Sequence, residues 1–167
     1  MDMRRVSGRD EAFTSYVSQR HRHLLRTAYL LCGDLHLAED LVQNTLVKLY
    51  MAWPRAARAD NVDAYVRRVL VNAHLDETRR PWRRERVVSD STLGASAPAH
   101  DLAGRDELTR ALRELPERQR AVVVLRHYWG LSIRETAEDL KISTGTVKSQ
   151  TAKALTSLAH SLQACEQ

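Results

Sequence analysis

The C-terminal part of the chain carries side chains of the types that bind DNA. Residues 131–158 read LSIRETAEDLKISTGTVKSQTAKALTSL, in which two short helical patterns flank the polar turn KISTG. No carboxylate occurs from Lys141 to the end of the second pattern, so no acid there would repel phosphates. Lysine can neutralise a phosphate, serine and glutamine can hydrogen-bond to base edges, and alanine can contact a thymine methyl. The outer side of the second helix is expected to carry Thr146, Lys148, Ser149, Gln150, Ala152 and Lys153.

A helix-turn-helix would position these side chains, because its first helix packs across the helix that carries them. A small residue on the first helix lets the two helices approach closely. The packing residues of that motif are expected to be Ala137, Leu140, Ile142 and Val147. Ser132 and Glu135 form an S-x-x-E capping box that opens the first of the two helices. The turn favours a left-handed backbone at Lys141, which costs a non-glycine residue about 1 kcal/mol. An ordinary amphipathic helix with a solvated basic face is the alternative that this pattern leaves open.

Apolar residues recur at helical intervals in the first half of the chain, and this pattern predicts three helices. The residues expected to cap or end these helices are, in chain order, Gly33, Asp34, Pro54, Asn61 and Pro81. Together they predict a three-helix unit over residues 10–82.

Residues 83–104 are rich in Ser, Ala, Gly and Pro without a steady period, and they predict a linker. A second unit of four helices is expected over residues 105–163, with breaks at Pro116, Gly130 and the KISTG turn. No segment predicts a strand. The expected fold class is therefore all-α, with two small helical domains joined by a flexible linker.

Composition and charge agree with a helical protein that binds an acidic partner. The 167 residues are 43% hydrophobic but only 5% aromatic, a mixture that favours helices over strands. The formal net charge is +5, which makes nucleic acid a plausible partner.

Cysteine and histidine usage argues against disulfides and metal chemistry. Cys32 and Cys165 lie far apart with no C-x-x-C spacing, which indicates a reducing compartment. The N-terminus lacks a signal-peptide pattern and no apolar run reaches the length of a membrane span, so we expect a cytoplasmic protein. His21 and His23 would point to different sides of a helix, and with His36 they show no metal-ligand spacing. Without a phosphate loop or nucleophile motif, we expect neither a cofactor nor enzyme activity.

Three segments together resemble a known family. LPERQRAVVVLRHYWGLSIRETAEDLKISTGTVKSQTAKAL resembles region 4 of a bacterial sigma factor, and AEDLVQNTLVKLYMAW resembles region 2.2. AYVRRVLVNAHLDETRR is similar to regions 2.3 and 2.4. With these two domains alone, the chain resembles the extracytoplasmic-function (ECF) sigma factors, and its sequence motifs are most similar to those of the actinobacterial SigE family.

The resemblance implies an RNA polymerase sigma factor. Such a protein binds core enzyme, recognises the −35 and −10 promoter elements, and promotes melting and initiation without catalysing chemistry. The implied partners are core RNA polymerase, through its β′ clamp helices and β flap, promoter DNA, and an anti-sigma factor. The residues implied in core polymerase binding are Asp40, Gln43, Asn44, Leu46 and Leu49.

The resemblance also assigns DNA contacts to both units. The helix from Asn61 to Arg80 would face the −10 element, with a flipped base held by the loop at residues 57–63, and Asn72 would contact DNA while Asp76 braces a neighbouring arginine. The implied phosphate contacts are Arg67, Arg68, Arg79, Arg80, Arg83 and Arg84. The −35 element would be read by Lys148, Ser149, Gln150, Ala152 and Lys153.

A stand-alone helix-turn-helix regulator is the competing interpretation. Such a protein would usually dimerise to match two half-sites. It would leave the first unit without a role.

Overall fold

The computed structural model of the chain describes residues 3–79 and 106–165. The predicted linker lies outside the described residues, as do Arg80, Pro81, Arg83 and Arg84. Every regular element in the described ranges is helical and none is a strand, which confirms the all-α fold class. No helix in these ranges combines the length and the apolar character needed to cross a membrane.

The first unit is a three-helix bundle whose helices begin and end at local signals in the sequence. Its helices are α1 (Met3–Cys32), α2 (Leu35–Ala56) and α3 (Val62–Thr78). Gly33 follows α1 with φ of +69°, a conformation that glycine adopts without strain. Asp34 accepts a 3.0 Å hydrogen bond from the Leu37 N–H, and Asn61 accepts one of 2.9 Å from the Ala64 N–H. Both predicted N-caps are therefore confirmed.

The prediction that Pro54 ends α2 is wrong, because the helix continues to Ala56. Proline has no N–H to offer the carbonyl of Tyr50. The guanidinium of Arg9, from α1, donates a hydrogen bond to that carbonyl instead. Tyr50 also donates from its hydroxyl to Asp10, at 2.8 Å. The early part of α1 thus supports the last turn of α2 across the proline.

The core of the first unit is built from the inner faces of all three helices. Its fully buried side chains include Leu24, Leu31, Leu41, Val42, Leu49, Val66, Leu70 and Val71. Each buried aliphatic side chain contributes about 1.5–3 kcal/mol relative to exposure. The rings of Phe13 and Tyr16 pack on Trp53, with centroids 5.4 and 5.6 Å apart.

The second unit contains four α-helices and one wider turn within its described residues. They are α5 (Asp106–Glu114), α6 (Glu117–Val123), a π-helical turn (Val124–Tyr128), α7 (Ile133–Leu140) and α8 (Thr144–Cys165). The continuous helix expected up to Gly130 is thus interrupted, because the Trp129 N–H bonds to the Val124 carbonyl at 3.1 Å, five residues back. Tyr128 and Trp129, at the end of this turn, face α1 of the first unit.

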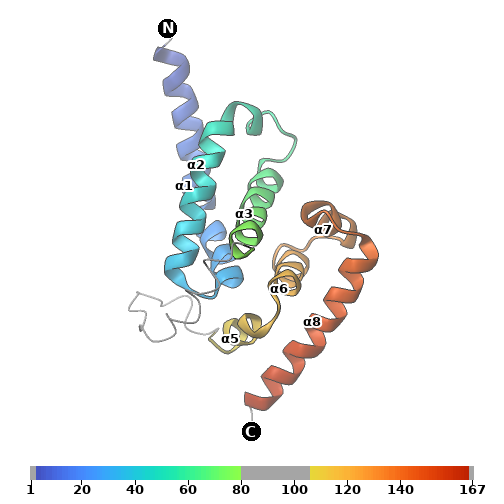
Figure 1. Cartoon of the computed structure of the whole chain (residues 1–167). Helices are drawn as coiled ribbons and strands as arrows, with labels where there is room; N and C mark the ends of the chain where they lie inside the picture. The colour runs from blue at the N-terminus through green and yellow to red at the C-terminus, as the bar shows by residue number, and fades with distance from the viewer. Residues whose placement is uncertain (1–2, 80–105, 166–167) are drawn as a thin grey trace.

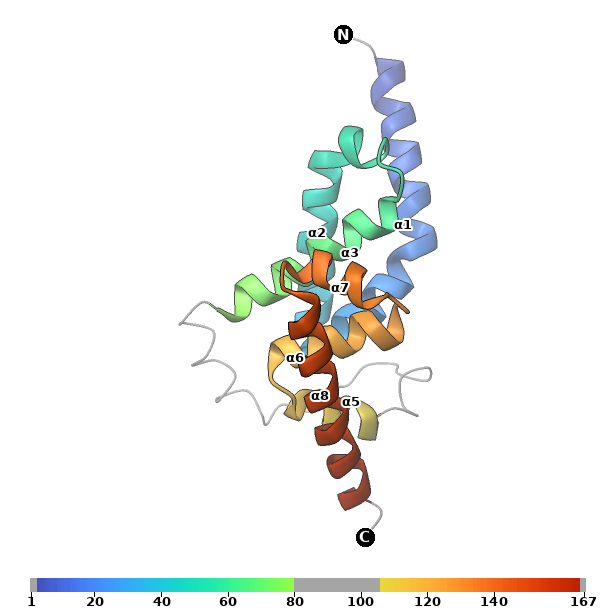
Figure 2. The same ribbon diagram turned by 90° about the vertical axis from the view of Figure 1, so that its right-hand side faces the viewer.

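The two units pack against each other along one side. The C-terminal half of α1 contacts α5, α6 and the π-helical turn, while α3 contacts α6 and α7. Figures 1 and 2 show α7 beside α3, and they place the start of α1 and the end of α8 at opposite ends of the molecule. The helix expected to face the −10 element therefore lies next to the helix-turn-helix.

Candidate nucleic-acid and polymerase interfaces

The helix-turn-helix is formed by α7 and α8, and its local geometry follows the sequence closely. Ser132 Oγ accepts a hydrogen bond from the Glu135 N–H at 3.1 Å, and Glu135 accepts one from the Ser132 N–H at 2.8 Å. This completes the predicted capping box, and hydrogen bonds from the Ser132 side chain and backbone to the Glu135 carboxylate lower the pKa of that carboxyl. Lys141 has φ of 54° and ψ of 46°, which confirms the left-handed residue in the turn. The Ile142 N–H bonds back to the Ala137 carbonyl at 3.1 Å and closes the turn.

The face of α8 that points away from the core carries the predicted DNA-contacting residues. Val147, Ala154 and Leu158 are buried against the rest of the second unit. Of the six predicted residues, four are exposed and two are half-buried. The exposed residues are Lys148, Ser149, Ala152 and Lys153, and the half-buried ones are Thr146 and Gln150. Gln150 Oε1 is enclosed and makes no hydrogen bond within the described residues.

The start of α8 is held by hydroxyl groups rather than by charge. Ser143 Oγ accepts a hydrogen bond from the Thr146 N–H at 3.0 Å and lies 2.8 Å from Thr146 Oγ1. Because the N-terminus of a helix carries a partial positive charge, this end of α8 suits a DNA phosphate.

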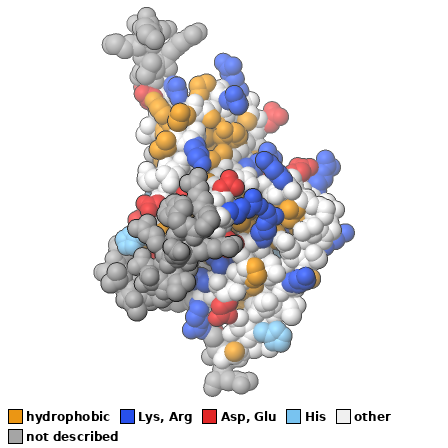
Figure 3. Space-filling model, viewed as in Figure 1, with side chains coloured by type: hydrophobic (Ala, Val, Ile, Leu, Met, Phe, Trp, Pro, Cys, Tyr) orange, Lys and Arg blue, Asp and Glu red, His pale blue; other side chains and the backbone are white. Residues whose placement is uncertain are grey.

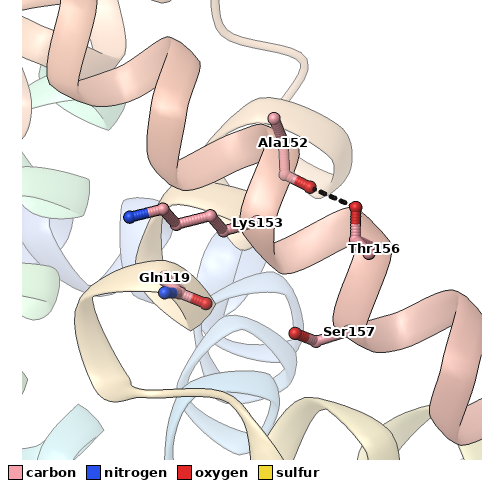
Figure 4. Close-up of a pocket in the computed structure, with 5 residues that line it drawn as sticks. All are labelled: Gln119, Ala152, Lys153, Thr156 and Ser157. Carbon is pink, nitrogen blue, oxygen red and sulfur yellow. Dashed lines mark hydrogen bonds between the residues drawn. The ribbon is translucent and has the colours of Figure 1, made fainter.

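An open hollow of about 500 Å³ lies beside the exposed face of α8. It is lined by Gln119 from the start of α6 and by Ala152, Lys153, Thr156 and Ser157 of α8. Figure 4 shows the Lys153 side chain extending above Gln119, while Thr156 donates its hydroxyl proton to the Ala152 carbonyl. The hollow is wide open to solvent.

The residues of α3 and its C-cap that are expected to face the −10 element differ in how accessible they are. Arg68, Asp76 and Arg79 are exposed, and Asn72 is half-buried. Arg67 is only 6% exposed. The implied phosphate contacts Arg80, Arg83 and Arg84 lie outside the described residues.

Arg67 and Arg68 both bind the carboxylate of Asp139, which projects from α7. Arg67 Nε lies 2.6 Å from Asp139 Oδ2, and Arg68 Nε lies 2.7 Å from Oδ1. The Asp139 side chain is 1% exposed. The guanidinium of Arg67 also lies over the Trp129 ring, 5.1 Å from its centroid. In this arrangement Arg67 contacts the second unit, and its contact with a DNA phosphate stays a prediction.

The loop before α3 is exposed at residues 57–60, but its last residue is engaged. Asp63 accepts hydrogen bonds from Arg20 Nε at 2.9 Å and from the Tyr16 hydroxyl at 2.8 Å. Partial burial alone would raise the pKa of the Asp63 carboxyl, but these hydrogen bonds bring it below its usual value. Asp63 therefore fixes the start of α3 to α1, and the loop's free side chains are those of residues 57–60.

The exposed side of α2 carries three of the residues implied in polymerase binding. Asp40, Gln43 and Asn44 are exposed. Leu46 and Leu49 are 8% and 0% exposed, so they form part of the core and can only support that surface. Their part in polymerase binding, as residues beneath the contact surface, stays a prediction.

Two apolar residues that the sequence analysis missed extend this surface. Val47 and Met51 are 59% and 76% exposed, and they follow Asn44 at helical spacing on the same side of α2. Their position three and seven residues after Asn44 is the sequence signal that could have identified them. Figure 3 shows apolar side chains gathered over the upper part of the first unit and basic side chains near the junction of the two units.

Comparisons with family models match both units. The model described as "Sigma-70 region 2" matches residues 16–84, and the model described as "Sigma-70, region 4" matches residues 105–158. The first range covers α1 from Tyr16 onward together with α2 and α3, and the second covers α5, α6, α7 and α8 as far as Leu158.

Relatives match over nearly the whole chain. The RNA polymerase sigma-E factor of Streptomyces avermitilis is 39% identical over 159 residues, covering 90% of this chain and 85% of the relative. The ECF RNA polymerase sigma factor SigM of Mycobacterium tuberculosis is 31% identical over 157 residues, covering 94% and 80%. Among solved structures, the sigma factor RpoE from Bartonella quintana, in complex with the anti-sigma factor NepR, is 27% identical with a TM-score of 0.72. That match covers 92% of this chain and 98% of the other.

Proposed function

The chain belongs to the sigma-70 family of RNA polymerase sigma factors, in its ECF group, and we propose how its residues divide the work of that function. A sigma factor binds core RNA polymerase, recognises the −35 and −10 promoter elements, and promotes promoter melting and initiation. The proposal assigns the −35 element to α8, the −10 element to α3 and core enzyme to α2. It assigns no catalysed reaction to the chain itself, and it places the chain in the cytoplasm with polymerase and DNA.

Recognition of the −35 element rests on the exposed face of α8. Lys148 and Lys153 would contact phosphates, which gives affinity and register. Ser149, Gln150 and Ala152 lie between them on the same helix and would contact base edges. The single observation that carries this assignment is a carboxylate-free exposed face on a helix held by a complete capping box and a left-handed turn.

Opening of the −10 element rests on α3 and the loop before it. Asn72 offers both a donor and an acceptor to DNA, and the exposed residues 57–60 border the position of a flipped base. Extruding a base costs a few kcal/mol, which hydrogen bonds and stacking in a pocket offset. Phosphate contacts from this region are assigned to Arg67, Arg68, Arg79, Arg80, Arg83 and Arg84.

Binding to core enzyme rests on the exposed side of α2. Asp40, Gln43 and Asn44 would meet the β′ clamp helices, and Val47 and Met51 would add an apolar centre to that contact. Aromatic and Met side chains are enriched at protein interfaces, and a rim of polar groups around them is usual. The second unit would contact the β flap.

An anti-sigma factor is proposed as a regulatory partner. The RpoE structure that resembles this chain contains such a protein.

Co-purification with core RNA polymerase from the source bacterium tests the α2 assignment. We expect the full-length chain to be retained by core enzyme at low salt and Asp40→Lys to weaken retention at least about tenfold, or about 1.4 kcal/mol. Glu107→Lys, which makes the same charge change at an exposed position of α5, should bind like the wild type. Equal losses in both variants would contradict the assignment, and no retention of the wild type would favour a stand-alone DNA-binding regulator.

A further inference from the structure

The contact between the two units ends in a three-residue ion-pair cluster, Arg67–Asp139–Arg68, which we call the latch. One carboxylate of the second unit holds two guanidinium groups of the first, at 2.6 and 2.7 Å. Asp139 and Arg67 are 1% and 7% exposed at their side chains, whereas Arg68 remains 51% exposed. The latch therefore encloses one arginine completely and leaves part of the other in solvent.

The latch occupies the same groups that the proposed function assigns to DNA. A guanidinium presents its N–H donors in a planar fork that fits a carboxylate or a phosphate equally well. Asp139 thus takes the place that a phosphate oxygen would take on α3. Because α7 also supports α8, the latch ties the helix assigned to the −10 element to the helix-turn-helix assigned to the −35 element.

The latch is not isolated, because Trp129 connects it to a second group of contacts. The Trp129 ring lies under the Arg67 guanidinium, and its Nε1 donates a 3.2 Å hydrogen bond to Thr27 Oγ1. The ring of His23 packs against Trp129 at 4.4 Å between centroids and stacks on Tyr128 at 5.1 Å. Removing a group from this cluster should weaken the latch without altering any charge.

The energy of such a contact is suited to an opening equilibrium. Removing charges from water offsets most of the attraction in a buried ion pair, so its net contribution to stability is small. When the units separate, all three charged groups return to solvent and none is left buried and unpaired. The closed form can then be displaced by a competing anion at modest cost.

We propose that the latch is an autoinhibitory contact, in which Asp139 substitutes for promoter phosphate and withholds Arg67 and Arg68 from DNA until the two units separate. This inference rests on the proposed DNA role of α3. It adds that the two units are in contact in the free chain and that Asp139 of the second unit sets how readily they separate.

The test compares two variants of the full-length chain that lose the same charge from the same helix. Asp139→Asn removes the latch while keeping the side-chain shape. Glu138→Gln is the matched control, because Glu138 is exposed and pairs with Arg134 four residues earlier on α7. Thr27→Val is a second, uncharged route to opening, since it removes the acceptor for Trp129. Circular dichroism would verify that each variant retains the helical content of the wild type.

Two measurements on these proteins test whether the latch holds the units together and whether it limits DNA binding. Small-angle X-ray scattering should give a larger radius of gyration for Asp139→Asn and Thr27→Val than for Glu138→Gln and wild type. Binding to a labelled random-sequence DNA duplex should strengthen in the same two variants. The plot of log affinity against log salt should steepen by about 1–2, because each added phosphate contact contributes about 0.9 to the slope.

An unchanged radius of gyration in Asp139→Asn would show that the latch does not hold the two units together. Larger size with an unchanged salt slope would overturn its autoinhibitory role, because the released arginines would then not bind phosphate. The scattering measurement does not require transcription, and the co-purification test of polymerase binding uses a residue of α2 rather than of α3. A failure of the proposed function and a failure of the latch would therefore be seen in different experiments.

Discussion

The guanidinium of Arg120 in α6 donates a 2.6 Å hydrogen bond to the carbonyl of Leu31, at the end of α1. The same side chain donates to the carbonyls of Leu112, Arg113 and Leu115, at 2.8, 2.9 and 3.0 Å. One buried cation thereby caps the C-terminal ends of helices from both units, where helix carbonyls are unpaired and the helix dipole is negative. Burial lowers the pKa of Arg120, and the ring of carbonyls compensates for the lost hydration.

We expect Arg120→Ala to lower the free energy of unfolding by about 2–3 kcal/mol, because hydrogen bonds to a charged donor are lost and buried carbonyls are left unpaired. Urea denaturation followed by circular dichroism measures this. Arg118→Ala, at an exposed position of the same helix, is the control and should change stability by less than about 0.5 kcal/mol. Equal effects of the two substitutions would show that Arg120 does not join the helix ends.

Gly33 and Gly130 provide a matched pair for testing how closely the units approach. Both have φ of +69°, so alanine at either position costs about 1–2 kcal/mol in backbone strain. A Cβ at Gly33 would lie 2.4 Å from two carbons of the Arg113 side chain, whereas a Cβ at Gly130 meets nothing within 4 Å. We therefore expect Gly33→Ala to be the more destabilising substitution in thermal unfolding, and equal losses would contradict the close packing of Arg113 on the end of α1.

The capping box predicts a pH dependence that can be assigned to one carboxyl group. Hydrogen bonds from the Ser132 side chain and backbone lower the pKa of Glu135 in the folded chain. A carboxyl group with a lowered folded pKa stabilises the protein above its unfolded pKa of about 4.3, and this contribution is lost as the pH falls through the folded pKa. Wild type should therefore be more stable than Glu135→Gln at neutral pH, and the difference should shrink below about pH 4. Urea denaturation over this pH range is the measurement, and a constant difference would contradict the assignment.

Much of the fold could be predicted from local signals. Asp34, Asn61, Ser132 and Glu135 act as caps in the structure as the sequence indicates, because capping depends on residues only a few positions apart. The left-handed residue Lys141 follows from the helix-turn-helix spacing.

Features that depend on distant contacts could not be predicted in the same way. α2 passes Pro54 because Arg9, more than forty residues earlier, binds the carbonyl that the proline leaves unpaired.

The two sides of α2, in contrast, could have been predicted from the periodicity of the helix alone. Leu46 and Leu49 lie on its inner side, whereas the apolar residues Val47 and Met51 are exposed.

The burial of Arg67 by Asp139 is a contact between residues 72 positions apart in different units. One partial signal for it is present in the sequence. Asp139 falls between Ala137 and Leu140 on the packed side of α7, where a carboxylate needs a cationic partner. Nothing local identifies that partner as a residue of α3.

The most direct test of the account is transcription by core RNA polymerase on pooled fragments of the source genome, with and without the chain, followed by mapping of transcript starts. We predict start sites that appear only when the chain is present. Asn72→Ala should abolish them, and so should the pair Lys148→Ala and Lys153→Ala, while Arg118→Ala should leave them unchanged. If no start depends on the chain, or if these starts persist at wild-type levels in both variants, the assignment of promoter recognition to α3 and α8 is contradicted.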